Sequence, residues 1–246
     1  MSSIMALRTL DIVRRQLSRA VASPGSDGEG GSERAFRLLL DAIVTLEYEP
    51  GQVVSEREVM VRTETTRPAL RLAVVRLSDL GLITPMARKG LLVAPLDLTD
   101  VSSVYDARTA IETAVVRFAA QRATPKQIAG LRALSEERHD APDEDVAGSF
   151  LARDLALHLA LAAAGRNRYL EDALTRILPL HARLWHRLYR ELGTDPKFMF
   201  EHDEIIEALA RRDAEAAVAK LLTHLQSARE ILASVFLPLT EEEPRA

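Results

Sequence analysis

The sequence predicts a mostly α-helical protein, with an N-terminal winged helix-turn-helix followed by a C-terminal antiparallel all-α bundle of about six or seven helices. Three observations support this fold class. The length of 246 residues favours two domains over one. Apolar residues recur at helical spacing along most of the chain. Two short strand-like runs, 82–84 and 91–93, flank the basic segment MARKG and suit a hairpin.

The composition excludes several classes of protein. The chain has no cysteine, so disulfides, thiolate nucleophiles and cysteine zinc sites are excluded, and any metal site must use histidines and carboxylates. Hydrophobic residues make up 47% and charged residues 28%, which excludes general disorder. The longest apolar stretch, near 155–165, is shorter than the roughly 18 residues of a membrane span. The apolar run at 4–7 is too short for a secretory signal, so we expect a cytoplasmic protein without a membrane partner.

The net charge of −4 is unevenly distributed along the chain. Residues 51–95 carry seven Arg and Lys against four Asp and Glu, a local charge of +3. This modest basic patch is compatible with nucleic-acid binding but does not establish it.

The two ends of the chain are expected to lie outside the folded domains. Residues 1–32 are interpreted as an N-terminal extension, with a short amphipathic helix over 1–22 and a flexible linker over 23–32. This extension is either dispensable or an arm that contacts a partner or DNA phosphates, and both interpretations stay open. A disordered tail is expected over 239–246.

The winged helix-turn-helix is expected over residues 33–96. Three helices are predicted there, at 33–46, from about 56, and at 67–80. Ser55 followed by Glu58 is a capping signal for the second helix. Thr66 is the expected N-cap of the third helix, and Gly81 its C-terminal stop. The hairpin around MARKG then forms the wing.

An all-helical domain is expected over residues 97–238. Six helices are predicted, at 98–122, 125–138, 144–164, 167–192, 198–211 and 214–236. Segments containing Asp, Gly or Pro separate them. Because no strand-like spacing interrupts this region, the helices are expected to pack as an antiparallel bundle.

Basic residues gather where a helix-turn-helix meets DNA. A helix fits the major groove, and arginines near its N-terminus can bond guanine through two parallel hydrogen bonds. Arg67 and Arg71 lie four residues apart, so they share one helix face. Each basic residue alone could be a solvated surface charge, but their combination with this layout favours DNA binding. The candidate DNA-binding residues are Arg57, Thr66, Arg67, Arg71, Arg88, Lys89 and Gly90.

Four titratable residues interrupt the apolar helix faces of the second domain. Asp154 and His158 lie four residues apart and project together, and His202 and His224 lie among apolar residues of two later helices. Buried without partners, such groups would each cost several kcal/mol, roughly, so something must satisfy them. A divalent cation held by one carboxylate and three imidazoles would do so. The alternatives are hydrogen-bonded core histidines and a surface pair of Asp154 with His158.

Two further residues lie on inward-facing helix stripes. Arg108 is expected to point inward and to need an anion, for which Glu112, one turn further on, is one candidate. His181 could line a pocket or simply pack in the core.

Residues 50–90, PGQVVSEREVMVRTETTRPALRLAVVRLSDLGLITPMARKG, resemble the DNA-binding domain of GntR-type bacterial transcription regulators. The shared pattern is a Pro-Gly turn, a Ser-Glu opening to the second helix, a Thr-Arg entry to an arginine-bearing recognition helix and a glycine wing. This resemblance implies that Arg57, Thr66, Arg67, Arg71 and Gly90 contact the operator. The chain differs from the usual pattern at three places around the recognition helix, Glu64-Thr65, Ala69 and Leu72.

Residues 98–236 are similar to the FCD-type ligand-sensing domain of the FadR-like subfamily. The motifs that carry this resemblance are YDARTAIE at 105–112, DLALH at 154–158, AGRN at 164–167, HDEIIEALARRDAEAA at 202–217 and the later His224. The resemblance implies a divalent metal ion on Asp154, His158, His202 and His224, with zinc preferred over nickel or manganese. It also implies a small organic acid against that metal, with Arg108 as the clamp for its carboxylate. Asn167 matches a family position at this site, although a helix N-cap explains it equally well.

Together these features predict a DNA-binding transcription regulator, a repressor, that is a homodimer and not an enzyme. A small carboxylate effector at the metal site would control its affinity for double-stranded operator DNA. Two alternatives stay open. The four candidate ligands could activate water in a metal-dependent hydrolase, although no HExxH motif is present. The chain could also be a metal-stabilised protein-interaction module.

Overall fold

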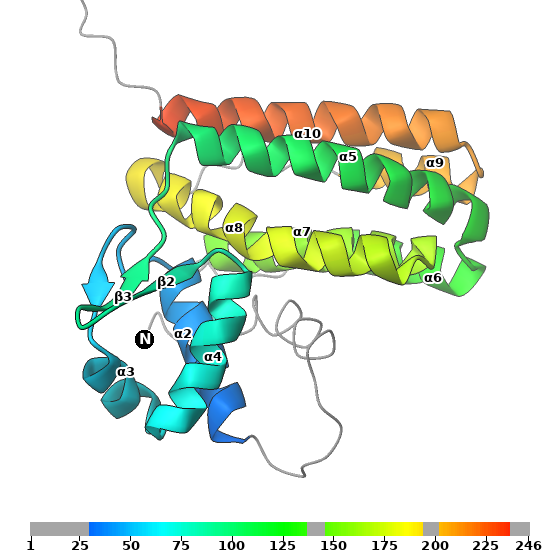
Figure 1. Cartoon of the computed structure of the whole chain (residues 1–246). Helices are drawn as coiled ribbons and strands as arrows, with labels where there is room; N and C mark the ends of the chain where they lie inside the picture. Colours follow the sequence, from blue (N-terminus) through cyan, green and yellow to red (C-terminus); the bar gives the residue numbers. More distant parts are fainter. Residues whose placement is uncertain (1–29, 137–145, 194–201, 237–246) are drawn as a thin grey trace, which may run out of the picture.

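The computed structural model describes residues 30–136, 146–193 and 202–236. Within these residues, helices make up most of the chain and the strands form one small sheet, which confirms the predicted fold class. Figure 1 shows a winged-helix unit at the lower left and a bundle of long helices above it. Most of the expected N-terminal extension and the whole expected tail lie outside the described residues.

Three helices form the body of the winged-helix unit: α2 (Gly31–Val44), α3 (Glu56–Thr63) and α4 (Arg67–Asp79). The Ser55 hydroxyl accepts a hydrogen bond from the Glu58 amide, as the capping signal predicts. Thr66 stands at the N-cap of α4, but its side chain makes no capping hydrogen bond. Glu64, in the turn between α3 and α4, has a φ of 51°, a left-handed conformation that glycine adopts more easily.

The wing belongs to a three-stranded antiparallel sheet of order β1-β3-β2. Its strands are β1 (Val53–Val54), β2 (Ile83–Met86) and β3 (Gly90–Val93). Met86 pairs with Gly90, so the wing tip is shorter than the predicted MARKG segment. The sequence prediction missed β1, because two residues are too few to show a strand period.

Gly90 has a structural role at the start of β3. Its φ is +113°, and a Cβ atom built there would lie 2.4 Å from the carbonyl oxygen of Val54. Gly90→Ala is therefore expected to destabilise the protein by roughly 2–4 kcal/mol, from backbone strain and a clash with a neighbouring strand. Chemical denaturation measures this free energy. The control is Gly51→Ala, because Gly51 has a φ of +80° but no atom within 4 Å of the added Cβ. Equal losses for both variants would show that the contact with β1 is unimportant.

Six helices form the bundle: α5 (Leu98–Arg122), α6 (Pro125–Glu136), α7 (Val146–Gly165), α8 (Arg168–Leu192), α9 (Asp203–Ala210) and α10 (Ala214–Phe236). The side chains of Asp97 and Asp100 cap the start of α5 reciprocally. Figure 1 shows α5 and α10 side by side along the top, with α7 and α8 below them. This packing buries the inward stripes of α5, α7, α8 and α10 in one core.

Several helix starts differ from the sequence prediction, among them those of α2, which begins at Gly31, and of α9. Instead of lying inside a helix over 198–211, His202 is the N-cap residue of α9, which begins at Asp203. Residues 198–201, which the prediction included in this helix, lie outside the described residues. The His202 side chain is buried.

Helix α8 joins the bundle to the winged-helix unit. Arg190 donates two hydrogen bonds, of 2.6 and 2.9 Å, to the Glu49 carboxylate in the loop after α2. Arg183, which is fully buried, donates a 2.6 Å hydrogen bond to the carbonyl oxygen of Ala94, just after the wing. Both contacts join residues far apart in the chain. Among the described residues, none of the helices has the length and apolar character needed to cross a lipid bilayer.

Candidate metal centre and nucleic-acid interface

Three helices bring one carboxylate and three imidazoles together inside the bundle. Asp154 and His158 lie one turn apart on α7, His202 caps α9, and His224 comes from the middle of α10. All four side chains are buried, and one ligand atom from each lies within 4.8 Å of all the others. These are the four residues that the sequence singled out as candidate ligands, and we call them the Asp-His cluster.

The Asp154 carboxylate lies at the centre of this cluster. Its Oδ1 atom is 3.2 Å from His202 Nε2 and 3.5 Å from His158 Nε2. The rings of His202 and His224 lie 4.3 Å apart between centroids. Nitrogen and oxygen donors at such spacing can converge on one cation.

An ion pair on α5 lies directly against the cluster. Arg108 Nε donates a 2.6 Å hydrogen bond to Glu112 Oε1, and both side chains are almost completely buried. The other oxygen of this carboxylate, Glu112 Oε2, is 2.5 Å from His158 Nδ1. Glu112 is thus the anion that Arg108 contacts, which is one of the two interpretations that the sequence left open.

The terminal nitrogens of Arg108 reach two histidines. Nη2 lies 3.0 Å from His158 Nε2, and Nη1 lies 3.0 Å from His181 Nδ1. On its other side, His181 Nε2 is 3.5 Å from the second oxygen of Asp154. His181 thus lies between Arg108 and the Asp154 carboxylate.

Burial and the surrounding charges move the histidine pKa values in opposite directions. Burial disfavours the imidazolium form of His158, but the Glu112 and Asp154 carboxylates outweigh it and raise the pKa of His158 to about 9. Burial, with the nearby Arg108 cation, lowers the pKa of His181 to about 4. Burial likewise lowers the pKa values of His202 and His224. The last two imidazoles are therefore neutral near pH 7, the form that binds metals.

A small opening reaches the cluster between α6 and α7. It has a volume of about 20 Å³, and Asp154 and His202 form part of its lining, together with Ser135 and Phe150. That volume holds about one water molecule or ion. An organic acid of several carbon atoms needs more space than this opening offers.

Asn167 lies at the junction between α7 and α8. Its side-chain oxygen accepts hydrogen bonds from the backbone amides of Tyr169 and Leu170, at 3.2 and 3.4 Å. This is an N-cap geometry, which is the second interpretation that the sequence left open for Asn167.

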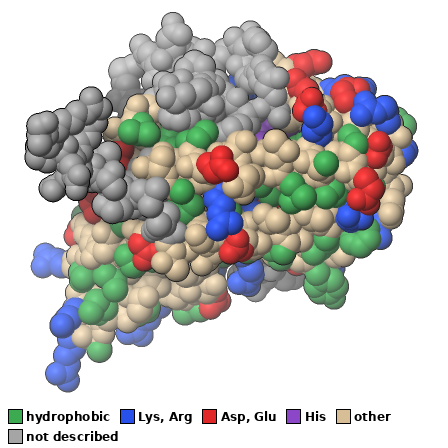
Figure 2. Space-filling view, turned by 90° about the horizontal axis from the view of Figure 1, so that it is seen from above, with side chains coloured by type: hydrophobic (Ala, Val, Ile, Leu, Met, Phe, Trp, Pro, Cys, Tyr) green, Lys and Arg blue, Asp and Glu red, His purple; other side chains and the backbone are tan. Residues whose placement is uncertain are grey.

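The candidate DNA-binding residues lie on the surface of the winged-helix unit. Six of the seven are exposed, namely Arg57, Thr66, Arg67, Arg71, Arg88 and Lys89, and Gly90 is half-buried. They come from α3, the start of α4 and the wing. Figure 2 shows basic side chains projecting at the lower left of the molecule, the side on which the wing lies in Figure 1. Over the bundle, the same view shows acidic and basic side chains interspersed.

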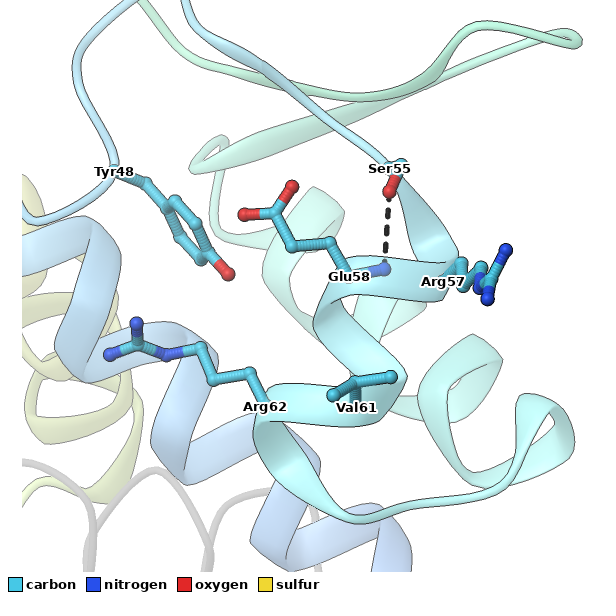
Figure 3. Close-up of a pocket in the computed structure, with 6 residues that line it drawn as sticks. All are labelled: Tyr48, Ser55, Arg57, Glu58, Val61 and Arg62. Carbon is cyan, nitrogen blue, oxygen red and sulfur yellow. Dashed lines mark hydrogen bonds between the residues drawn. The ribbon is translucent and has the colours of Figure 1, made fainter.

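A shallow hollow of about 420 Å³ lies beside α3 (Figure 3). It is lined by Tyr48 and by side chains of α3 that include Arg57, Glu58 and Arg62. Arg62 is engaged in an ion pair with Glu47 and lies 5.4 Å from the centre of the Tyr48 ring. Figure 3 shows Arg57 turned away from Tyr48, and the Arg57 side chain is exposed. Among the charged side chains that line this hollow, Arg57 therefore points away from it, where it could contact another molecule.

The sequence prediction missed one residue at the centre of these contacts. Glu112 was considered only as a partner of Arg108, because the two lie four residues apart. Its second contact is to His158, which lies 46 positions later, and no local spacing indicates it. The signal in the sequence was a glutamate one turn from Arg108 on a helix with an inward-facing stripe.

Exposed arginines on a winged helix-turn-helix that is joined to a helical bundle are typical of bacterial DNA-binding regulators with a second, all-helical domain. Residues 32–93 match the family model for bacterial regulatory proteins of the gntR family, and residues 103–227 match the model for the FCD domain. The chain belongs to the GntR family of transcription regulators that carry an FCD domain. Both resemblances noted in the sequence are confirmed.

Known regulators are similar over most of their length. The Nta operon transcriptional regulator of Aminobacter aminovorans is 29% identical over 183 residues, which cover 74% of this chain and 85% of that protein. The transcriptional repressor RspR of Escherichia coli is 26% identical and covers 81% of this chain and 87% of its own. A putative GntR regulator of Rhodococcus sp. RHA1 has a similar structure, with a TM-score of 0.64, 27% identity and coverage of 82% and 97%. Escherichia coli McbR/YncC, at 16% identity and a TM-score of 0.73, shares the fold over 83% of this chain and 98% of its own.

Proposed function

We propose that this transcription regulator is a repressor whose operator affinity is controlled by a small organic acid, bound at a divalent metal ion in the FCD domain. The observation that carries the proposal is the Asp-His cluster, in which four buried ligand atoms lie within 4.8 Å of one another. A cluster of this kind at the surface would be unremarkable, but buried polar groups require partners.

The donor set fits a divalent cation of the first transition series. Asp154, His158, His202 and His224 offer one oxygen and three nitrogen ligands, which suit zinc, with nickel and manganese as alternatives. Four protein ligands leave coordination positions open when the ion takes five or six ligands. The ion would supply a Lewis acid that attracts a carboxylate.

The effector contacts follow from the charges beside the cluster. Arg108 is a permanently charged donor with two terminal nitrogens facing His158 and His181, so a carboxylate entering between them would find hydrogen-bond donors on one side and the cation on the other. Because this opening holds about one water molecule, we infer that the acid binds better to a bundle in which the site is wider. Only such differential affinity allows a ligand to shift a conformational equilibrium.

Helix α8 is the element that would transmit this rearrangement. It carries His181 beside the cluster and, further along, Arg183 and Arg190, which contact the winged-helix unit. A displacement of α8 at the effector site would therefore move the contacts that orient the wing and α2. In a homodimer, the spacing of two winged helices sets the fit to an inverted-repeat operator.

DNA recognition is assigned to the exposed residues of α3, α4 and the wing. Arg67 and Arg71 at the start of α4 would contact base edges, and Arg57, Arg88 and Lys89 would contact the backbone or the minor groove. Thr66 and Gly90 would approach the DNA backbone. We propose repression, and not activation, of transcription because two relatives from Escherichia coli, RspR and the galactonate operon regulator, are described as repressors.

The test is operator binding with and without zinc and acid. A duplex is first selected by the full-length protein from a random pool, and its affinity is measured by fluorescence anisotropy. We expect affinity to fall steeply with salt, and a small hydroxy acid or dicarboxylic acid to change Kd about 5- to 150-fold only when zinc is bound.

Three outcomes contradict the proposal. Salt-insensitive binding would point to a protein partner instead of DNA. Chemical conversion of the acid, lost on chelation, would indicate the hydrolase alternative. An operator affinity unchanged by every acid in the presence of bound zinc would exclude effector control at this site.

A further inference from the structure

Both oxygens of the buried Glu112 carboxylate lie against nitrogen atoms of other side chains. Oε1 accepts the 2.6 Å hydrogen bond from Arg108 Nε, and Oε2 lies 2.5 Å from His158 Nδ1. Glu112 is 1% exposed, so water does not compete for either oxygen. This single side chain therefore contacts both a candidate metal ligand and the candidate effector clamp.

The contact with Glu112 decides which nitrogen of His158 can bind a cation. A neutral imidazole carries one N–H and one lone pair. When a cation displaces one proton of His158, the proton that remains lies on Nδ1, toward Glu112, because a carboxylate can only accept. The lone pair is then on Nε2, which lies 3.5 Å from Asp154 Oδ1 and 3.0 Å from Arg108 Nη2. Carboxylates that accept the second N–H of a metal-binding histidine generally fix its tautomer and ring orientation.

We propose that Glu112 is a positioning residue that holds His158 in the metal-binding tautomer and at the same time holds Arg108 in place to receive an acid. The inference rests on the proposed function, since it concerns the same metal and effector site. In this inference, one carboxylate positions both a metal ligand, His158, and the residue proposed to bind the acid, Arg108.

Replacing Glu112 with glutamine separates these two contacts chemically. The amide has one acceptor oxygen and one donor nitrogen, whereas the carboxylate has two acceptors. Arg108 cannot give up its Nε proton, so the amide oxygen must face Arg108. The amide nitrogen then faces His158 Nδ1, which must accept and therefore carry the lone pair. The proton moves to Nε2, where it blocks the cation.

The first test compares zinc affinities of full-length proteins by competition with a chelating dye. Glu112→Gln is expected to weaken zinc binding about 10- to 100-fold, the usual effect of losing a residue behind a metal ligand. The control is Asp106→Asn, which removes a carboxylate from the same helix, where Asp106 is exposed and pairs with Arg229 at 2.8 Å. This control should bind zinc as the wild type does. Circular dichroism and cooperative thermal unfolding verify that both variants fold.

The second test needs no variant. In zinc-loaded wild-type protein labelled with ¹⁵N-histidine, long-range nitrogen–proton spectra distinguish a protonated from a metal-bound ring nitrogen. We expect His158 to carry its proton on Nδ1 and to bind zinc through Nε2. The reverse arrangement would overturn the inference.

The outcomes separate this inference from the proposed function. Equal zinc affinities of the wild type and Glu112→Gln would overturn the role of Glu112 alone. Failure of the wild-type protein to bind zinc, nickel or manganese would overturn the proposed metal site and this inference with it.

Discussion

Replacing His202 with alanine is expected to weaken zinc binding by more than about 100-fold. The reason is that His202 is itself a proposed ligand. Even the loss of a residue that only hydrogen-bonds to a metal ligand typically lowers metal affinity about 10- to 100-fold. The helix that it caps should survive, because the His202 side chain makes no capping hydrogen bond. A metal-specific effect can therefore be separated from unfolding.

Thermal unfolding in the presence of zinc gives the clearest measurement. At a zinc concentration of 100 times Kd, binding adds about 2.7 kcal/mol to the stability of the wild-type protein. His202→Ala should lose this increment and, with it, every response of operator binding to acids. Metal analysis of the same samples reports the stoichiometry directly.

His186→Gln is the matched control for the loss of a histidine. His186 lies on α8, and only desolvation acts on its pKa, which is lowered to about 4 without influence from the Asp-His cluster. This variant should bind zinc at wild-type stoichiometry. Full zinc occupancy of His202→Ala, or equal losses in both variants, would contradict the assignment of the cluster.

Arg67→Ala is expected to reduce specific operator binding by about 1–3 kcal/mol, or roughly 5- to 150-fold in Kd. Arg67 is the first residue of α4, and its side chain is 61% exposed, so it is free to enter a groove of DNA. Its contact with Glu56, at 3.7 Å, is solvent-exposed and contributes little to folding. The loss should therefore appear in DNA affinity and leave thermal stability unchanged.

Anisotropy titrations on the selected operator and on an unrelated duplex test this prediction. If Arg67 contacts a base edge, the operator affinity falls more than the non-specific affinity. Arg132→Ala serves as control, because Arg132 is an exposed arginine of α6 paired with Glu207 in the bundle, at 2.8 Å. An unchanged operator affinity for Arg67→Ala, or an equal loss for Arg132→Ala, would refute the proposed recognition surface.

Helical periodicity was sufficient to predict most of the fold. The starts and ends of the helices depend on nearby residues, such as Ser55 with Glu58 before α3 or Asn167 before α8. Local hydrogen bonds of this kind involve neighbours in the chain and leave a signal in the sequence. The strand β1 left no such signal, since its partner β3 lies almost forty residues further on.

In the candidate metal site, too, some features follow from local sequence and others depend on how the helices pack. The shared face of Asp154 and His158 follows from their spacing on one helix, and the inward position of His224 from its apolar neighbours. Whether the three helices would bring these groups to one point depends on how α7, α9 and α10 pack. The distance of 4.8 Å or less between the ligand atoms is a property of that packing.

By itself, the amino-acid sequence determined the fold class, the family and the four candidate ligands of this regulator, because helical spacing and motif residues are local properties of a chain. Only the tertiary structure decided that Glu112 contacts His158, that His181 connects Arg108 with Asp154, and that Arg190 of α8 holds Glu49 of the winged-helix unit. Each of these contacts joins residues on different elements. Their geometry is set by the packing of the whole core, which no short stretch of sequence specifies.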